Sequence, residues 1–176
     1  MNNEKLRSAA ELDAADWDKV VSRAEALMAS HKFGCSEALL LAFQETLGEE
    51  MLPRAAVSMA SAFRGGLGGS GCLCGALAAG EMVLGSVFGY EGDANGVQDP
   101  EAVKKSRLLF KELHDRFRER FKASCCRVLT KGMDHASPER KTQCTNLVKM
   151  TSALTSGIIA REVLVLAARA TPNPLR

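Results

Sequence analysis

The amino-acid sequence predicts an all-α fold, a single-domain bundle of about five or six helices. Aliphatic residues and alanine dominate the composition, and aromatic residues make up only 5% of the chain. Runs of β-branched residues are short, and apolar residues recur at three- and four-residue steps. A chain of 176 residues is long enough to bury one hydrophobic core. We therefore expect residues 1–176 to form one helical, cysteine-containing domain, with residues 1–15 as a loosely ordered N-terminal segment.

The N-terminal half of the chain contains apolar patterns for helices at residues 16–31, 36–47, 53–63 and 73–88. Gly48 closes the second helix, because glycine readily adopts the left-handed conformation that ends a helix. Pro53 suits the first turn of the third helix, where its missing amide hydrogen has no partner in any case. A glycine-rich loop over residues 65–71 precedes the fourth helix.

Two longer helices are expected in the C-terminal half. Asp99-Pro100-Glu101 provides an N-cap, a first-turn proline and an acidic first turn for a helix to about Phe121. A loop is expected from Cys125-Cys126 through Gly132. Ser137-Pro138-Glu139 then begins a last helix that runs to about Ala170.

Charge and hydropathy restrict the classes of partner. A net charge of +2 gives no basic field for nucleic acid. The N-terminus lacks an apolar signal-peptide core, and the most apolar run, residues 73–89, is short and contains Glu81. We expect a cytoplasmic protein without a membrane partner, whose apolar surface is compatible with a homodimer. Residues 104–131 hold ten Lys or Arg against three acids, which indicates a solvated face or a docking surface for an acidic redox partner protein.

The six cysteines are the main functional signal. In the cytoplasm they favour metal binding or redox chemistry over structural disulfides, although free cysteines also serve as small buried apolar residues. Each lies at an expected helix end or on an inward face, and none is expected on a solvated surface. Thiols from four elements are thereby able to gather around one point. Unrelated core cysteines would show the same pattern.

The stretch GGLGGSGCLCGALAAG at residues 65–80 contains seven glycines and two cysteines. Its G-x-G-x-x-G does not follow a strand, and no Gly-Lys-Ser/Thr follows it, so a nucleotide site is disfavoured. Glycines also let the backbone approach a bulky group and turn its amides toward negative charge, such as thiolates or a cluster. A cysteine at a helix N-terminus is further biased toward its thiolate. The alternative interpretation is a flexible connection between two helices.

The order of these features resembles the redox-active protein family named for its C…GCAxxG…C…C cysteine pattern. The similar segments are FGCSEALL with Cys35, GGLGGSGCLCGAL with Cys74, FKASCCRVL with Cys126 and ERKTQCTNLV with Cys144, within about residues 20–165. A related helical domain of split-Soret cytochromes holds an iron–sulfur cluster through cysteines of this kind. The resemblance implies an all-α bundle with a redox or cluster-binding role, and it defines no reaction.

The sequence departs from the family pattern at several positions. Three residues, not two, separate Cys74-Gly75-Ala76 from Gly80, and the haem-attachment pattern C-x-x-C-H is missing. Cys72 and Cys125 are additional cysteines and are taken as secondary. The choice of Cys126 over Cys125 depends only on the Arg-x-Leu that follows it.

Three functions remain open. The first is an iron–sulfur site for electron transfer or sensing, held by Cys35, Cys74, Cys126 and Cys144 and surrounded by Gly68, Gly69, Gly71 and Gly75. The second is metal-free thiol–disulfide chemistry, with Cys72 and Cys74 or the two adjacent cysteines as reacting pairs. The third is a structural zinc site or a non-catalytic helical binding module, although the close C-x-x-C pairs typical of zinc are absent. The sequence predicts neither an enzymatic reaction nor a particular electron donor, acceptor or substrate.

Overall fold

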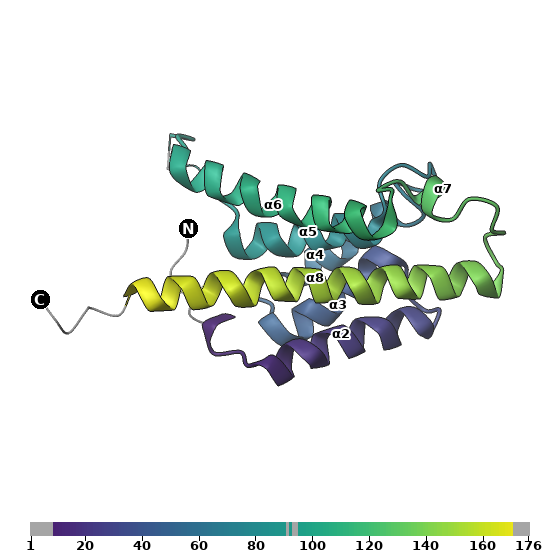
Figure 1. Cartoon of the computed structure of the whole chain (residues 1–176), viewed down its shortest axis with the longest axis horizontal. Coiled ribbons are helices and arrows are strands. Elements are labelled where there is room, and N and C mark those ends of the chain that lie inside the picture. The colour runs from purple at the N-terminus through teal and green to yellow at the C-terminus, as the bar shows by residue number, and fades with distance from the viewer. Residues whose placement is uncertain (1–8, 91, 93–94, 171–176) are drawn as a thin grey trace, which may run out of the picture.

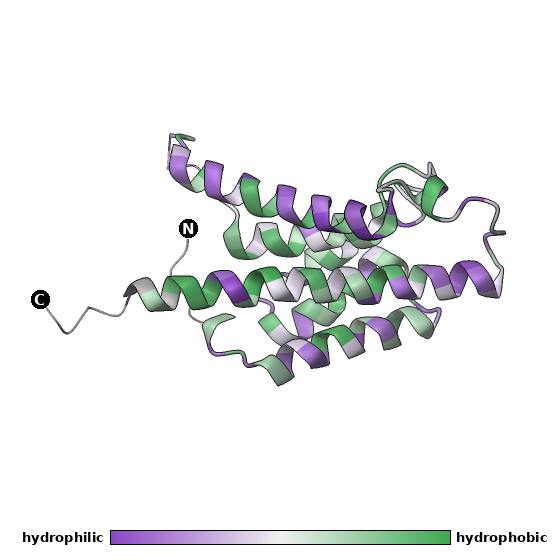
Figure 2. Cartoon of the chain, in the orientation of Figure 1, coloured by the Kyte–Doolittle hydropathy of each residue, from purple (hydrophilic) through white to green (hydrophobic). Residues whose placement is uncertain are grey.

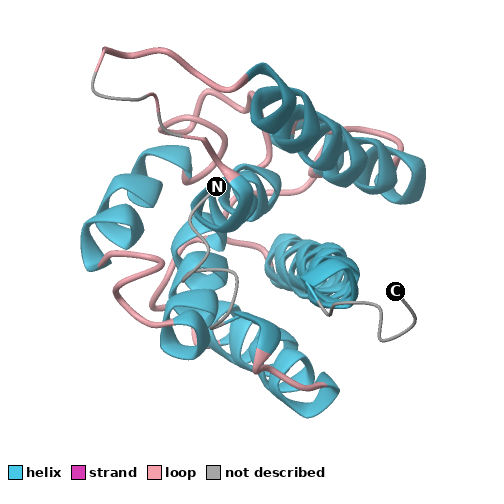
Figure 3. Cartoon of the chain, turned by 90° about the vertical axis from the view of Figure 1, so that its left-hand side faces the viewer, coloured by secondary structure: helices cyan, strands magenta, loops and turns pink. Residues whose placement is uncertain are grey.

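The computed structural model describes residues 9–90, 92 and 95–170, which form helices joined by loops and turns (Figure 3). The helices are α2 (Ala14–Ala29), α3 (Cys35–Leu47), α4 (Arg54–Ala60), the 3₁₀ helix η1 (Ser61–Phe63), α5 (Gly75–Phe88), α6 (Pro100–Phe121), α7 (Cys126–Leu129) and α8 (Pro138–Ala170). These residues contain no strand, so the predicted all-α fold is confirmed. Residues 1–8 of the expected loose N-terminal segment lie outside the described residues, and Ala9 is buried in the core.

Helix α8 organises the bundle. It runs along the length of the molecule in Figure 1, with α2 on one side and α6 on the other, and it contacts α2, α3, α5 and α6. Helix α5 is mostly hydrophobic in Figure 2, and most of its residues are buried. In the part of the chain that the structure describes, no helix combines the length and apolar character that a membrane crossing requires.

The helix boundaries follow the local signals in the sequence. The Asp13 carboxylate accepts a hydrogen bond from the amide of Asp16, and the Asp16 carboxylate accepts one from the amide of Asp13, which forms a reciprocal cap on α2. Asp99 caps α6 through the amide of Glu101, at 3.0 Å, with Pro100 in the first turn. The boundaries expected for the helices at residues 100–121 and 138–170 are confirmed.

A glycine on α5 allows close packing of three helices. A Cβ on Gly80 would lie 2.8 Å from Oγ1 of Thr155 and 3.0 Å from Cδ2 of Leu113, which belong to α8 and α6. Only hydrogen fits at this distance, so Gly80 lets α5 approach both neighbours.

Glu81 on α5 makes folding stability depend on pH. Its Oε2 is buried and has no hydrogen-bond partner among the described residues, and burial raises the pKa of this carboxyl to about 8. The folded protein therefore binds a proton that the unfolded chain releases near the ordinary value of 4.5. The contribution to stability is complete below that value and is lost as the pH rises through about 8, with a slope of at most about 1.4 kcal/mol per pH unit.

We expect Glu81→Gln to remove this dependence. The variant and the parent should unfold at similar urea concentrations at acidic pH, and the variant should be the more stable of the two at pH 8.5. Urea unfolding across this range, followed by circular dichroism, gives the difference in the free energy of unfolding. A difference that does not grow with pH would show that Glu81 is ionised in the folded protein.

Candidate functional site

The structure brings together four cysteines from segments that are far apart in the sequence. Cys35 is the first residue of α3, Cys74 is the N-cap of α5, Cys126 is the first residue of α7, and Cys144 lies near the start of α8. The thiols of Cys35, Cys74 and Cys144 each interact electrostatically with that of Cys126, and those of Cys74 and Cys144 also interact with that of Cys35. These four are the residues predicted as the main set.

Hydrogen bonds between two loops hold Cys74 close to Cys126. The amide of Cys74 donates to the carbonyl of Ser124 at 2.8 Å, and the amide of Arg127 donates to the carbonyl of Gly71 at 3.0 Å. The glycine-rich loop therefore lies against the segment that carries Cys126, near α7 in Figure 1. On the other side, Nε2 of Gln143 donates to the carbonyl of Leu129 at 3.3 Å, which ties the start of α8 to α7.

The one-turn helix α7 was not expected, since the sequence predicts a loop from Cys125 through Gly132. The amides of Leu129 and Thr130 donate to the carbonyls of Cys125 and Cys126, and Oγ1 of Thr130 donates to the carbonyl of Cys126 at 2.8 Å. A single turn is too short to give an apolar period. The single helix expected at residues 53–63 is also corrected, because the structure contains α4 followed by the 3₁₀ helix η1.

Two glycines make room for the thiols. A Cβ on Gly75 would lie 2.5 Å from Sγ of Cys35, and a Cβ on Gly66 would lie 2.9 Å from Cβ of Cys126. Gly66 also has a φ of +76°, a conformation that side chains disfavour. The amide of Gly65 donates to the thiol of Cys35. Gly65 and Gly66 were not among the expected site residues.

The other glycines of the expected site do not surround the cysteines. Gly68 and Gly69 are exposed, and a Cβ on either would meet nothing within 4 Å. A Cβ on Gly71 would lie 2.8 Å from Cβ of Arg127. The amides of Gly66, Gly68, Gly69 and Gly71 donate to carbonyls of residues 62–65, so they are not available to sulfur. The expected nest of loop amides around the thiols is therefore wrong, apart from the amide of Gly65.

Burial dominates the electrostatics of the thiols. It raises the pKa of Cys74 to about 12 and that of Cys144 to about 11, and it raises the pKa of Cys35. The amides of Ala76 and Leu77 at the start of α5 lower the pKa of Cys74, but they do not outweigh burial. As long as no metal is bound, the thiolate that was expected at this helix N-terminus is therefore disfavoured.

The two secondary cysteines, Cys72 and Cys125, do not belong to the group of four. Cys72 is exposed, which corrects the expectation that no cysteine is on a solvated surface, and Cys125 is half-buried at the N-cap of α7. Neither is among the groups that shift the pKa of Cys35, Cys74 or Cys144.

A cavity of about 330 Å³ opens to solvent above the cysteines. Its lining includes Cys35, Cys126 and Cys144, while Cys74 is buried beneath them. Arg140 also lines it: Nη2 of this residue lies 4.0 Å from Sγ of Cys126, and the guanidinium donates to the thiol of Cys144. Sequence reasoning missed Arg140, although its position four residues before Cys144 places both on one helix face.

The thiols are not arranged around a single ion. Among the described residues, no three side chains of His, Cys, Asp or Glu form a group that could hold one metal ion. A zinc ion would need such a group, because its ligands all lie within about 2.3 Å of one centre. In a cluster each thiolate can bind a different iron, which leaves the sulfur atoms farther apart.

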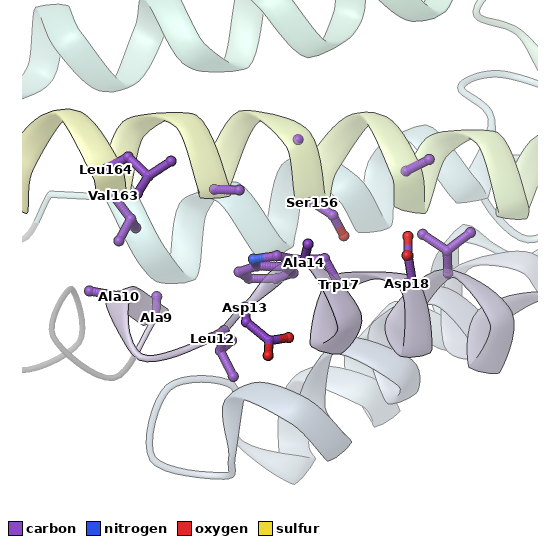
Figure 4. Close-up of a pocket in the computed structure, with 14 residues that line it drawn as sticks. Ala9, Ala10, Leu12, Asp13, Ala14, Trp17, Asp18, Ser156, Val163 and Leu164 are labelled. Carbon is purple, nitrogen blue, oxygen red and sulfur yellow. The ribbon is translucent and has the colours of Figure 1, made fainter.

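A second cavity, of about 460 Å³, lies between residues 9–21 and the C-terminal half of α8 (Figure 4). Trp17 and Ser156 line it from opposite sides, and most of its wall is apolar. No cysteine is among the described residues that line this cavity.

Comparison with known proteins identifies a family. Residues 33–158 match the model of the family described as "Putative redox-active protein (C_GCAxxG_C_C)". The chain belongs to this family. The match includes all four cysteines of the group, and the predicted family resemblance is confirmed. No curated protein and no solved structure matches the chain.

Proposed function

We propose that Cys35, Cys74, Cys126 and Cys144 hold an iron–sulfur cluster and that this C_GCAxxG_C_C family member transfers or senses electrons. The observation that carries this proposal is the gathering of four thiols, from the starts of α3, α5, α7 and α8, three of which line one cavity. Two of these cysteines, Cys74 and Cys126, are buried, and Cys35 and Cys144 are half-buried. Four cysteine thiolates are the usual ligand set of such clusters.

The residues around the thiols fit a cluster in kind. Thiolates are soft ligands that suit iron–sulfur clusters, and Gly66 and Gly75 leave space where any side chain would collide with Cys126 or Cys35. When bound, a cluster supplies reversible one-electron chemistry. The protein would hold its sulfur ligands with amide hydrogen bonds, from Gly65 to Cys35 and from Ala76 and Leu77 to Cys74. Hydrogen bonds of this kind adjust the reduction potential.

A metal-free thiol–disulfide function is the second candidate. It is supported by Arg140, whose guanidinium donates to the thiol of Cys144 in an open cavity and lowers the pKa of that thiol, although burial outweighs this effect. It is opposed by the burial of Cys74 and the raised pKa of that thiol, because a neutral buried thiol is a poor nucleophile. The cluster uses all four cysteines, and the thiol–disulfide function leaves Cys74 without a role.

An acidic redox partner protein would find a basic surface next to the site. Arg118, Arg120 and Lys122 lie at the C-terminal end of α6 and lead directly into the segment that carries Cys126. Among the described residues, no ion pair with a carboxylate involves these three side chains. Complementary charge would speed association with such a partner and make it sensitive to salt.

Purification without oxygen tests the function. We expect a brown protein with sulfur-to-iron charge-transfer absorption and with iron and acid-labile sulfide bound in similar amounts. A colourless protein that loses free thiols reversibly on mild oxidation would support the thiol–disulfide function instead. A colourless protein whose four thiols neither oxidise nor bind iron would overturn both.

A further inference from the structure

The cavity that Cys35, Cys126 and Cys144 line also carries basic side chains. His31, Arg64, His135, Arg140 and Lys141 line it together with three of the thiols. Among the residues that the structure describes, no Asp or Glu lines the cavity.

Two of these basic residues, Arg140 and Lys141, have no carboxylate partner among the described residues. Within the described part of the chain, no ion pair joins Arg140 or Lys141 to an acidic side chain, whereas Arg64 lies 3.3 Å from Oε2 of Glu37. Lys141 is exposed at the rim and Arg140 is half-buried beside Cys126 and Cys144. Charge that is not neutralised in a recess focuses the field on its interior and concentrates ions of opposite sign there.

We infer that this cavity admits a small anionic molecule to the sulfur site and disfavours neutral or cationic ones. The ligand would carry a carboxylate or an oxyanion, which the planar donor group of Arg140 is suited to bind. A cavity of about 330 Å³ restricts it to a small molecule, since this is the lower end of the range for ligand sites. The inference depends on the proposed function only in that the cavity leads to the reacting sulfur atoms.

The test compares two alkylating reagents that differ in charge. Iodoacetate is an anion and iodoacetamide is its neutral amide, so the ratio of their rates at one cysteine cancels the reactivity of that thiol. In the reduced full chain without metal, mass spectrometry follows Cys126 and Cys144, with the exposed Cys72 as the internal reference. We expect the rate ratio at the two cavity cysteines to exceed that at Cys72 by about 10-fold at low salt and to fall toward it as salt is added.

Charge-removing variants give the matched comparison. Lys141→Gln and the double variant R140Q/K141Q should lower the ratio at Cys126 and Cys144 several-fold, with the greater loss in the double variant. Lys104→Gln removes the same charge from an exposed position on α6 and should leave the ratio unchanged. Because Lys141 is exposed, the single variant should fold normally, which circular dichroism checks.

A second readout tests occupancy with a simple anion. Inorganic sulfate should slow the reaction of neutral iodoacetamide at Cys126 and Cys144, leave Cys72 unaffected, and lose this protection in R140Q/K141Q. A ratio that equals that of Cys72, or one that responds to Lys104→Gln as much as to Lys141→Gln, would overturn the inference. Iron content is measured separately: normal iron incorporation without anion selectivity rejects this inference alone, and selectivity without iron rejects the cluster alone.

Discussion

We expect Cys74→Ser to abolish iron binding while the helical fold is retained. Cys74 is buried at the N-cap of α5 and interacts with the thiols of Cys35 and Cys126. Serine is nearly the same size and is a favoured N-cap residue, so the start of α5 should remain stable. A hydroxyl cannot replace a thiolate as a soft ligand. The iron bound per chain should fall by more than about 10-fold, because mutating residues that only support metal ligands already causes a loss of about this size.

The matched control is Cys72→Ser, two residues earlier in the same loop. Cys72 is exposed, and it is not among the groups that shift the pKa of the other thiols. The variant should keep the iron content and the visible absorption of the parent. Iron analysis and absorption spectra of both variants, prepared without oxygen, make the comparison, and equal losses in the two would contradict the assignment of Cys74 as a ligand.

The second large effect is expected for Gly66→Ala. At this position a Cβ would lie 2.9 Å from Cβ of Cys126 and 2.9 Å from the amide nitrogen of Cys72. The left-handed backbone conformation costs an alanine about 1–2 kcal/mol. The collision should add a further cost of about 1–3 kcal/mol, because the contacting atoms belong to the backbone and to a buried cysteine. The variant should also lose iron, since Cys126 must move to accommodate the methyl group.

Gly68→Ala separates the cost of the left-handed backbone conformation from the cost of the collision with Cys126. Gly68 has a φ of +62° and shares the left-handed conformation, but a Cβ there would meet nothing within 4 Å. We expect this variant to lose only the backbone contribution to the free energy of unfolding and to bind iron as the parent does. Urea unfolding gives both differences, and similar losses of stability and iron in the two alanine variants would show that contact with Cys126 is unimportant.

The helices could be predicted because their signals are local. Asp99 and Pro100 mark the start of α6 with no help from the rest of the fold, and the apolar period of α8 is long enough to count. The turn of α7 could not be predicted in the same way, since one turn is too short for an apolar period and the amide of Arg127 bonds to the carbonyl of Gly71 in the glycine-rich loop. Sequence patterns therefore predict helices that are long enough to show an apolar period, and they fail for short helices whose formation depends on tertiary contacts.

The candidate site was predictable in its cysteines and not in its surroundings. Cys35, Cys74, Cys126 and Cys144 could be selected from their places at helix ends and from the family resemblance. The roles of the individual glycines could not be predicted, because residues 65–80 contain seven of them. Gly66 differs from Gly68 only in that a Cβ on Gly66 would collide with Cys126, which the sequence does not reveal. The raised pKa of Cys74 was also not predictable, since helix position favours the thiolate and only burial, a tertiary property, reverses it.

The central claim is that four distant cysteines act as one iron-binding site, and an alkylation footprint tests it most directly. The protein prepared without oxygen is treated with a small neutral maleimide before and after removal of iron by a chelator, and each cysteine is quantified by mass spectrometry. We expect Cys35, Cys126 and Cys144, which line the open cavity, to be protected together while iron is bound and to become more reactive together after its removal, with Cys72 labelled throughout. Labelling of these three cysteines that does not change with iron, or that changes for each one separately, would contradict the account.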